Sequence, residues 1–91
     1  MSDVTRSHVV VHGHVQGVFF RDSARRQAET RGVAGWITNR PDGAVEAVFE
    51  GDPDDVAALV EFCRSGPRGA DVREVEESSE DPEGLRGFRI R

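Results

Sequence analysis

Two hydrophobic patterns follow one another along this chain of 91 residues, and their order limits the folds that it can adopt. Apolar residues at every second position predict strands, whereas apolar residues three and four apart predict helices with one buried face. The helical pattern occupies residues 22–31 and the segment between Asp52 and Gly66. The strand pattern occupies residues 7–13, 33–39 and 44–50 and, more weakly, 72–77 and 88–91.

Cap and turn residues mark the ends of these elements. Asp52 is suited to cap the second helix and Pro53 to occupy its first position, while Gly66 is placed to end it. Gly32 is placed to end the first helix in the same way. Residues 40–43, Arg-Pro-Asp-Gly, form a turn signal, so the second and third strands are expected to form a hairpin.

The predicted order is β-α-β-β-α-β, the split βαβ pattern of the ferredoxin-like α+β fold, with an antiparallel sheet and two helices on one face. Val72 and Val75 lie three residues apart and break the alternation of their strand. That segment therefore either contains a β-bulge or is not a strand. A chain of this length builds one modest core, so residues 1–91 are expected to form a single domain.

The balance of charge and the cysteine count exclude several classes of function. Acidic residues outnumber basic ones by 17 to 12, so nucleic acid and anionic membranes, which basic patches hold, are not expected partners. No apolar run is long enough to predict a membrane span, and the start of the chain lacks a secretory leader pattern. The single cysteine, Cys63, cannot form an internal disulfide, which favours the cytoplasm. A monomer is expected, because no long apolar patch is evident.

The segment from Gly13 to Arg21 has the layout of an anion site. Gly13 and Gly17 allow the backbone to turn its N–H groups inward, and the following helix start adds partial positive charge. Arg21 supplies a planar fork that grips two oxygens of a phosphate at once. The glycine spacing and the lack of a Lys-Ser/Thr pair exclude a Walker A loop, and the segment has no cysteine to act as a nucleophile.

The chain resembles the acylphosphatase family over nearly its whole length, and two motifs carry the resemblance. Residues 13–21 fit the pattern G-x-V-Q-G-V-x-F-R at every fixed position. Residues 35–39, Gly-Trp-Ile-Thr-Asn, form the second motif, with Gly43, Val45 and Gly51 at the expected offsets. The resemblance implies hydrolysis of the carboxyl-phosphate bond of a small-molecule acyl phosphate, without a metal, a cofactor or a covalent intermediate.

The resemblance also implies roles for individual residues. Arg21 matches the phosphate-binding catalytic arginine of the family, and Asn39 matches the asparagine that orients the attacking water. Inorganic phosphate is then expected as product and competitive inhibitor. The backbone N–H groups that match the phosphate-binding loop of the family belong to Val15, Gln16, Gly17, Val18, Phe19 and Phe20.

Two other functions remain as alternatives. The same fold in a noncatalytic, regulatory module would bind an anion at this site without turnover. The same order of elements also builds RNA-recognition domains, which stack bases on aromatic side chains of the central strands. Here those strands lack exposed aromatic residues and the third carries Glu46 and Glu50, which disfavours RNA.

Several other side chains allow two interpretations. His8, His12 and His14 share parity along the first strand and could bind zinc, but a solvated strand face is the favoured interpretation. Trp36 could stack on an acyl group, although packing against a helix is favoured. Of the two phenylalanines before Arg21, alternation predicts that one enters the core and the other lines the mouth of the site.

Overall fold

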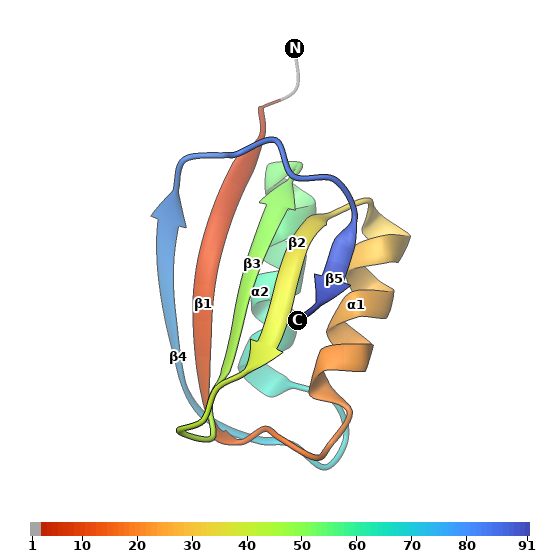
Figure 1. The fold of residues 1–91 in the computed structure, drawn as a ribbon. Helices are drawn as coiled ribbons and strands as arrows, with labels where there is room; N and C mark the ends of the chain where they lie inside the picture. Colours follow the sequence, from red (N-terminus) through yellow and green to blue (C-terminus); the bar gives the residue numbers. More distant parts are fainter. Residues whose placement is uncertain (1–2) are drawn as a thin grey trace.

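The computed structural model describes residues 3–91, which form two helices and five strands. The order confirms the ferredoxin-like α+β fold, with one further strand after the second βαβ half (Figure 1). The elements are β1 (Thr5–His14), α1 (Phe20–Arg31), β2 (Ala34–Asn39), β3 (Val45–Gly51), α2 (Pro53–Ser65), β4 (Asp71–Glu80) and β5 (Phe88–Ile90).

The strands form one sheet in the order β4-β1-β3-β2-β5. All neighbouring pairs are antiparallel except β2 and β5, which are parallel with Gly35 opposite Phe88. Figure 1 shows the reason: residues 81–87 cross the end of the sheet from β4 on one edge to β5 on the other. The chain then runs back in the direction of β2. The sheet is therefore mixed, whereas the sequence predicted only antiparallel pairs.

A β-bulge in β4 explains the broken alternation of that strand. His12 lies opposite Glu74 and Gly13 opposite Val72, so Arg73 is an extra residue without a partner in β1. Val72 and Val75 both pack against the core as a result. Gly13 allows β4 to approach here, because a Cβ at this position would lie 2.1 Å from the Asp71 carbonyl oxygen. Its role is strand pairing, not the shaping of an anion loop that the sequence predicted.

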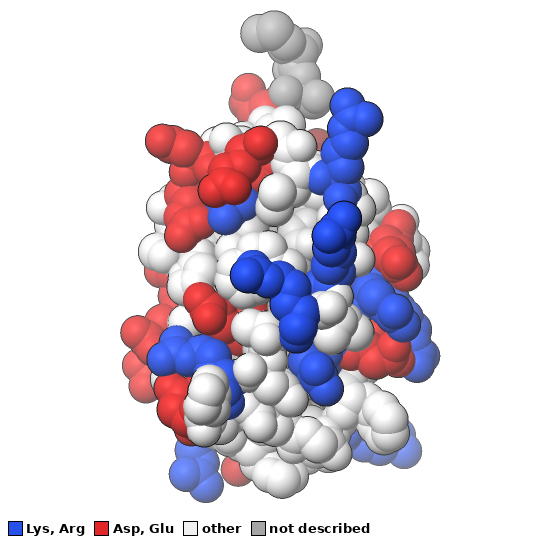
Figure 2. Space-filling view, in the orientation of Figure 1, with Lys and Arg blue, Asp and Glu red and all other residues white. Residues whose placement is uncertain are grey.

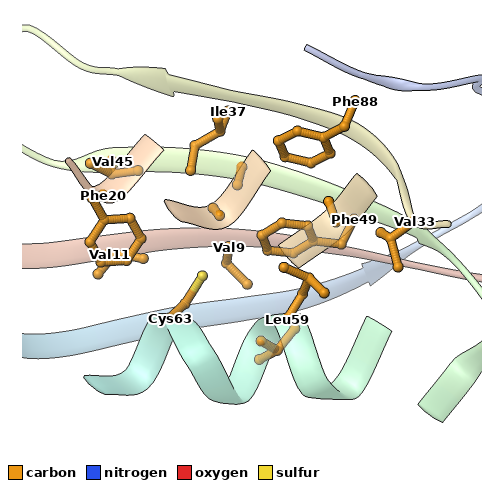
Figure 3. Packing of buried hydrophobic residues seen from close by; sticks show 14 of the residues in the cluster. Val9, Val11, Phe20, Val33, Ile37, Val45, Phe49, Leu59, Cys63 and Phe88 are labelled. Atoms are coloured by element: carbon orange, nitrogen blue, oxygen red, sulfur yellow. The ribbon is translucent and has the colours of Figure 1, made fainter. Parts of the chain in front are cut away.

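Both helices cover the same face of the sheet (Figure 1), α1 over β2 and β5 and α2 over β1, β3 and β4. Ala24 and Ala28 are fully buried, and their small side chains allow α1 to pack closely. From α2, Leu59 and Cys63 point toward the sheet, where they meet a layer that includes Phe49 (Figure 3). Within residues 3–91 no helix is long and apolar enough to cross a membrane.

The other face of the sheet, which we call the open face, carries polar pairs. His8 Nε2 lies 2.7 Å from Glu46 Oε2 on β3, so this imidazole has a carboxylate partner that the sequence did not predict. Figure 2 shows acidic side chains gathered over the upper parts of β4 and β1 and arginines over β2 and β5. The Arg91 guanidinium lies 4.3 Å from the ring centre of Trp36. Trp36 therefore lies on the open face, and the prediction that it packs against a helix is wrong, because its neighbour Ile37 occupies the core.

Glu50 fixes the connection between β4 and β5 through hydrogen bonds. Its side chain is 3% exposed and accepts hydrogen bonds from the backbone N–H groups of Glu83, Gly84 and Leu85 at 2.8 to 2.9 Å. Arg6 pairs with the same carboxylate at 3.3 Å. Burial acts to raise the pKa of the Glu50 carboxyl, but these hydrogen bonds outweigh it and lower the pKa. The charged carboxylate thus fixes the path of residues 83–85 toward β5.

Candidate active site

A cavity of about 380 Å³ lies where the 15–20 loop, the end of β2 and β5 meet. It brings together Arg21 and Asn39, the two residues that the sequence predicted as catalytic. Its lining consists of Val15, Gly17, Phe19, Phe20, Arg21, Asp22, Asn39 and Ile90. The predicted loop residues Gln16 and Val18 are not among them.

Helix α1 begins at this cavity without a side-chain cap. Phe19 occupies the N-cap position and makes no capping hydrogen bond, and the first turn closes from Ser23 N–H to the Phe19 carbonyl oxygen at 3.0 Å. Helix α2 differs, because Asp52 Oδ1 accepts a hydrogen bond from Asp54 N–H at 3.0 Å. The first N–H groups of α1 have no acceptor within the helix. Together with the helix dipole, they favour an anion at this end.

The backbone of the 15–20 loop is shaped by two residues with positive φ. Gly17 has φ 76°, and Phe19 has φ 61°, the only positive value among the non-glycine residues that the structure describes. A phenylalanine in this conformation costs about 1 to 2 kcal/mol, and such residues cluster at functional sites. Successive residues that alternate between right-handed and left-handed backbone conformations form concave arrays of N–H groups, and such arrays bind anions. The predicted role of Gly17 agrees with this geometry.

Arg21 stands close to a carboxylate but does not pair with it. Arg21 forms no salt bridge with any residue from 3 to 91, whereas the neighbouring Asp22 pairs with Arg25 at 2.7 Å and with Arg26. The hydrogen bond from Arg26 and the charges of Arg26 and Arg25 lower the pKa of the Asp22 carboxyl, against an opposing effect of burial. Asp22 is therefore ionised and already compensated, which leaves the Arg21 guanidinium available to an anion.

Asn39 ends β2 with its side chain at the cavity. Its Oδ1 atom is buried and accepts no hydrogen bond from a residue that the structure describes. Most buried acceptors in folded proteins are paired, so this unpaired oxygen, on a residue that lines the cavity, is a candidate to accept a hydrogen bond from a ligand or a water.

Gln16 serves the site in a way that the sequence analysis missed. Its Nε2 donates hydrogen bonds to the carbonyl oxygens of Arg40 at 2.8 Å and Ala44 at 2.9 Å. The side chain therefore ties the 15–20 loop to the hairpin that follows Asn39. The sequence did contain a signal for this role. Gln16 occupies a fixed position of the family motif, although the loop was expected to bind the anion through its backbone.

The two phenylalanines divide as predicted. Phe20 is 1% exposed and packs against Phe62 with ring centres 5.6 Å apart, whereas Phe19 is 80% exposed at the mouth of the cavity. Ile90 was not predicted to reach the site. Strand alternation gives a signal for it, because Ile90 shares the face of the sheet on which Phe88 is buried.

Comparison with known proteins points to one family. The acylphosphatase family model matches residues 7–90. An acylphosphatase of Haloarcula marismortui is 54% identical over 87 residues, which cover 96% of each chain. One of Gloeobacter violaceus is 50% identical over 90 residues, 99% of this chain and 97% of the relative. The solved structure of an acylphosphatase from Coxiella burnetii matches with a TM-score of 0.93 at 40% identity, covering 98% of this chain and 94% of that one.

Proposed function

The chain belongs to the acylphosphatase family, and we propose that the cavity beside Arg21 is the active site in which it hydrolyses acyl phosphates. Relatives that share about half of its residues over nearly the full length are acylphosphatases, which favours the enzyme over the noncatalytic module. One observation carries the proposed site: an uncapped helix start, an arginine without a salt bridge and an asparagine whose Oδ1 has no hydrogen-bond partner among the described residues border the same cavity.

The phosphate group binds to main chain and Arg21 together. The free N–H groups at the start of α1 and in the 15–20 loop donate to phosphate oxygens, and the Arg21 fork donates to two of them. Phosphoryl transfer spreads negative charge over the equatorial oxygens in the transition state. Donors that are already fixed by the helix stabilise this charge without reorganising.

Asn39 positions the water. Its Oδ1 accepts a hydrogen bond from the attacking water, whose oxygen then bonds to phosphorus as the bond between phosphorus and the acyl oxygen breaks. The carboxylate leaves with the bonding electrons, and the proton of the water passes to a phosphate oxygen, because an amide cannot act as a base. The products are a carboxylate and inorganic phosphate, and phosphate competes with substrate for the same loop.

The substrate itself makes this machinery sufficient. The leaving carboxylate is weakly basic, so positioning and charge stabilisation lower the barrier without a strong general acid or a covalent nucleophile. Cys63, the single cysteine of the chain, lies in the core, where burial raises the pKa of its thiol to about 12. It is therefore a protonated core residue and not a nucleophile.

We propose further that residues 1–91 act as one domain and as a monomer in the cytoplasm. The exposed large apolar side chains of the described residues are only Val4, Phe19 and Ile90, which is little apolar surface for a stable partner. A buried, unpaired cysteine agrees with a reducing compartment. The net charge of -5 continues to disfavour nucleic acid.

Two substitutions test the proposed site. Arg21→Gln is expected to abolish turnover of acetyl phosphate and, in calorimetry, binding of inorganic phosphate. Asn39→Ala is expected to lower kcat by about 100-fold or more, while phosphate still inhibits the residual activity. Arg73→Gln is the control, because Arg73 is exposed in the bulge of β4 and forms no salt bridge with a described residue.

Steady-state kinetics of the purified proteins distinguishes the alternatives. Near-normal turnover of Asn39→Ala would remove Asn39 from the mechanism. Wild-type protein that binds phosphate but hydrolyses no acyl phosphate would favour the regulatory module.

A further inference from the structure

Exposed apolar side chains of this protein gather at the candidate active site. Of the large apolar residues that are exposed within residues 3–91, Phe19 and Ile90 line the cavity that holds Arg21 and Asn39. Phe19 is 80% exposed and Ile90 is 38% exposed. Apolar surface that remains in water at a cavity indicates a contact with a ligand.

The cavity has a polar part and an apolar part. Arg21, Asn39 and the free N–H groups of α1 supply the polar part. The apolar part comes from Phe19 and Ile90, with Val15 and Phe20, each 1% exposed, joining the core beneath the lining. An acyl phosphate is divided in the same way, into a charged phosphate and a carbon chain.

We propose that Phe19 and Ile90 form an acyl subsite, which makes this enzyme prefer acyl phosphates with apolar chains or rings longer than acetyl. The inference rests on the proposed function, because it needs the phosphate to bind at Arg21. Under this proposal Phe19 and Ile90 determine which acyl group the enzyme prefers, but they take no part in breaking the bond to phosphorus.

The fold fixes the backbone at both residues of the acyl subsite. The left-handed N-cap conformation of Phe19 directs its ring away from the core, while the next residue, Phe20, enters the core. Ile90 belongs to β5, which is fixed by the hydrogen bond from Arg91 N–H to the Ile37 carbonyl oxygen at 2.8 Å. A fixed backbone on both sides of the cavity removes part of the cost of ordering the apolar surface when a ligand binds.

The lining also disfavours a charged acyl group. Neither Phe19 nor Ile90 offers a hydrogen bond to a second carboxylate, and a buried carboxylate without a partner is costly. A six-carbon chain that ends in a methyl group is therefore preferred to one that ends in a carboxylate.

The test begins with a substrate series on the wild-type protein: acetyl, butyryl and hexanoyl phosphate, with adipoyl phosphate as the charged match of hexanoyl. KM is expected to fall about two- to fourfold for each CH₂ that the cavity covers. The value of kcat is expected to change little, because a contact remote from the reacting bond is made equally in ground and transition states. Adipoyl phosphate is expected to have a KM roughly tenfold above that of hexanoyl phosphate.

Variants then assign the preference to the two side chains. Phe19→Ala and Ile90→Ala are each expected to lower the hexanoyl-to-acetyl ratio of kcat/KM by roughly fivefold. Phe19→Leu and Ile90→Val are expected to retain most of that ratio. Val4→Ala is the matched control, because Val4 is 51% exposed and lies outside the cavity.

Binding of stable analogues separates this inference from the proposed function. Calorimetry with acetylphosphonate and hexanoylphosphonate measures the apolar contact without turnover. Tighter binding of hexanoylphosphonate that Phe19→Ala weakens supports the acyl subsite even if no acyl phosphate is hydrolysed. A flat wild-type series, or alanine variants that keep the wild-type ratio, would overturn it.

Discussion

Gln16 donates a hydrogen bond from its side-chain amide to the carbonyl oxygen of Arg40, with 2.8 Å between Nε2 and O. The same nitrogen reaches the Ala44 carbonyl oxygen at 2.9 Å. Because Asn39 immediately precedes Arg40, these bonds fix the distance between the 15–20 loop and the asparagine. A single glutamine therefore joins the proposed phosphate-binding loop to the segment that carries the proposed water-positioning asparagine.

Replacing this glutamine is expected to impair the chemical step more than binding. Gln16→Met keeps the length of the side chain but removes both donors, so Asn39 is no longer fixed relative to the loop. We expect kcat for acetyl phosphate to fall by about 10- to 100-fold, because small misplacements of this kind are costly. Inhibition by phosphate is expected to change less than threefold. The control is Gln27→Met, at the chain's other glutamine, and an equal loss there would contradict the proposed positioning role.

Neutralising Asp22 is expected to strengthen anion binding. Asp22→Asn removes a charged carboxylate from the cavity lining and releases Arg25 and Arg26 from their pairs. Phosphate is expected to inhibit about two- to fivefold more strongly at low ionic strength, and the difference is expected to vanish in 1 M salt, where screening is strong. Asp54→Asn, in the first turn of α2, controls for the helix dipole and should leave inhibition unchanged. Unchanged inhibition in Asp22→Asn would contradict this prediction.

Two glycines with similar φ angles allow the effects of backbone strain and of anion binding to be measured separately. Gly17 in the 15–20 loop has φ 76° and Gly32 at the end of α1 has φ 68°, and a Cβ at either position meets no atom within 4 Å. Gly17→Ala and Gly32→Ala should therefore lose similar stability, about 1 kcal/mol each. Only Gly17→Ala is expected to weaken inhibition by phosphate, because Gly17 lines the cavity. Thermal unfolding and inhibition assays measure the two effects separately.

Glu50 is expected to make stability depend on pH in the acid range. Its folded pKa lies below its usual 4.5, so it stabilises the fold above that pH and loses this contribution as the pH falls through the folded pKa. Glu50→Gln is expected to lower the free energy of unfolding by about 3 kcal/mol at pH 7, because Arg6 and three N–H groups lose a charged acceptor. Denaturant unfolding from pH 7 to pH 3 should show the variant and wild type converging. Glu29→Gln, at an exposed position of α1, should show no such convergence.

The sequence was sufficient to predict the helices and the first three strands, because their periods and end signals agree. Helix α1 begins at Phe20, two residues before the predicted start, since its N-cap is a phenylalanine and not a residue that signals a cap. The parallel pairing of β5 was not predictable from its three residues, because hydrogen bonds with β2 and the path of residues 81–87 determine it.

The parts of the candidate site that lie close in sequence could be predicted from the chain. The glycine at position 17 and the helix start that follows it indicate an anion loop on physical grounds alone, and Asn39 entered through the family motif. The contact of Gln16 with Arg40 and the arrival of Ile90 were missed, because both depend on segments that meet only in the folded chain. The position of Trp36 was predicted wrongly for a related reason. Strand alternation places Trp36 and Ile37 on opposite faces of the sheet, but it does not tell which face the helices cover.

Under the proposed function, the uncapped start of α1 makes the bound anion a structural component of the protein. Asp52 caps the first turn of α2 with its side chain, whereas α1 has no side-chain cap and leaves its first N–H groups for the proposed phosphate. An anion that binds only the folded chain adds RT ln(1 + [L]/Kd) to stability, about 2.7 kcal/mol at a hundred times Kd. The melting temperature of this protein is therefore a property of its buffer as well as of its sequence. Stability measured in phosphate buffer refers to the protein with an anion at the start of α1, whereas stability measured in a zwitterionic buffer refers to the protein without one.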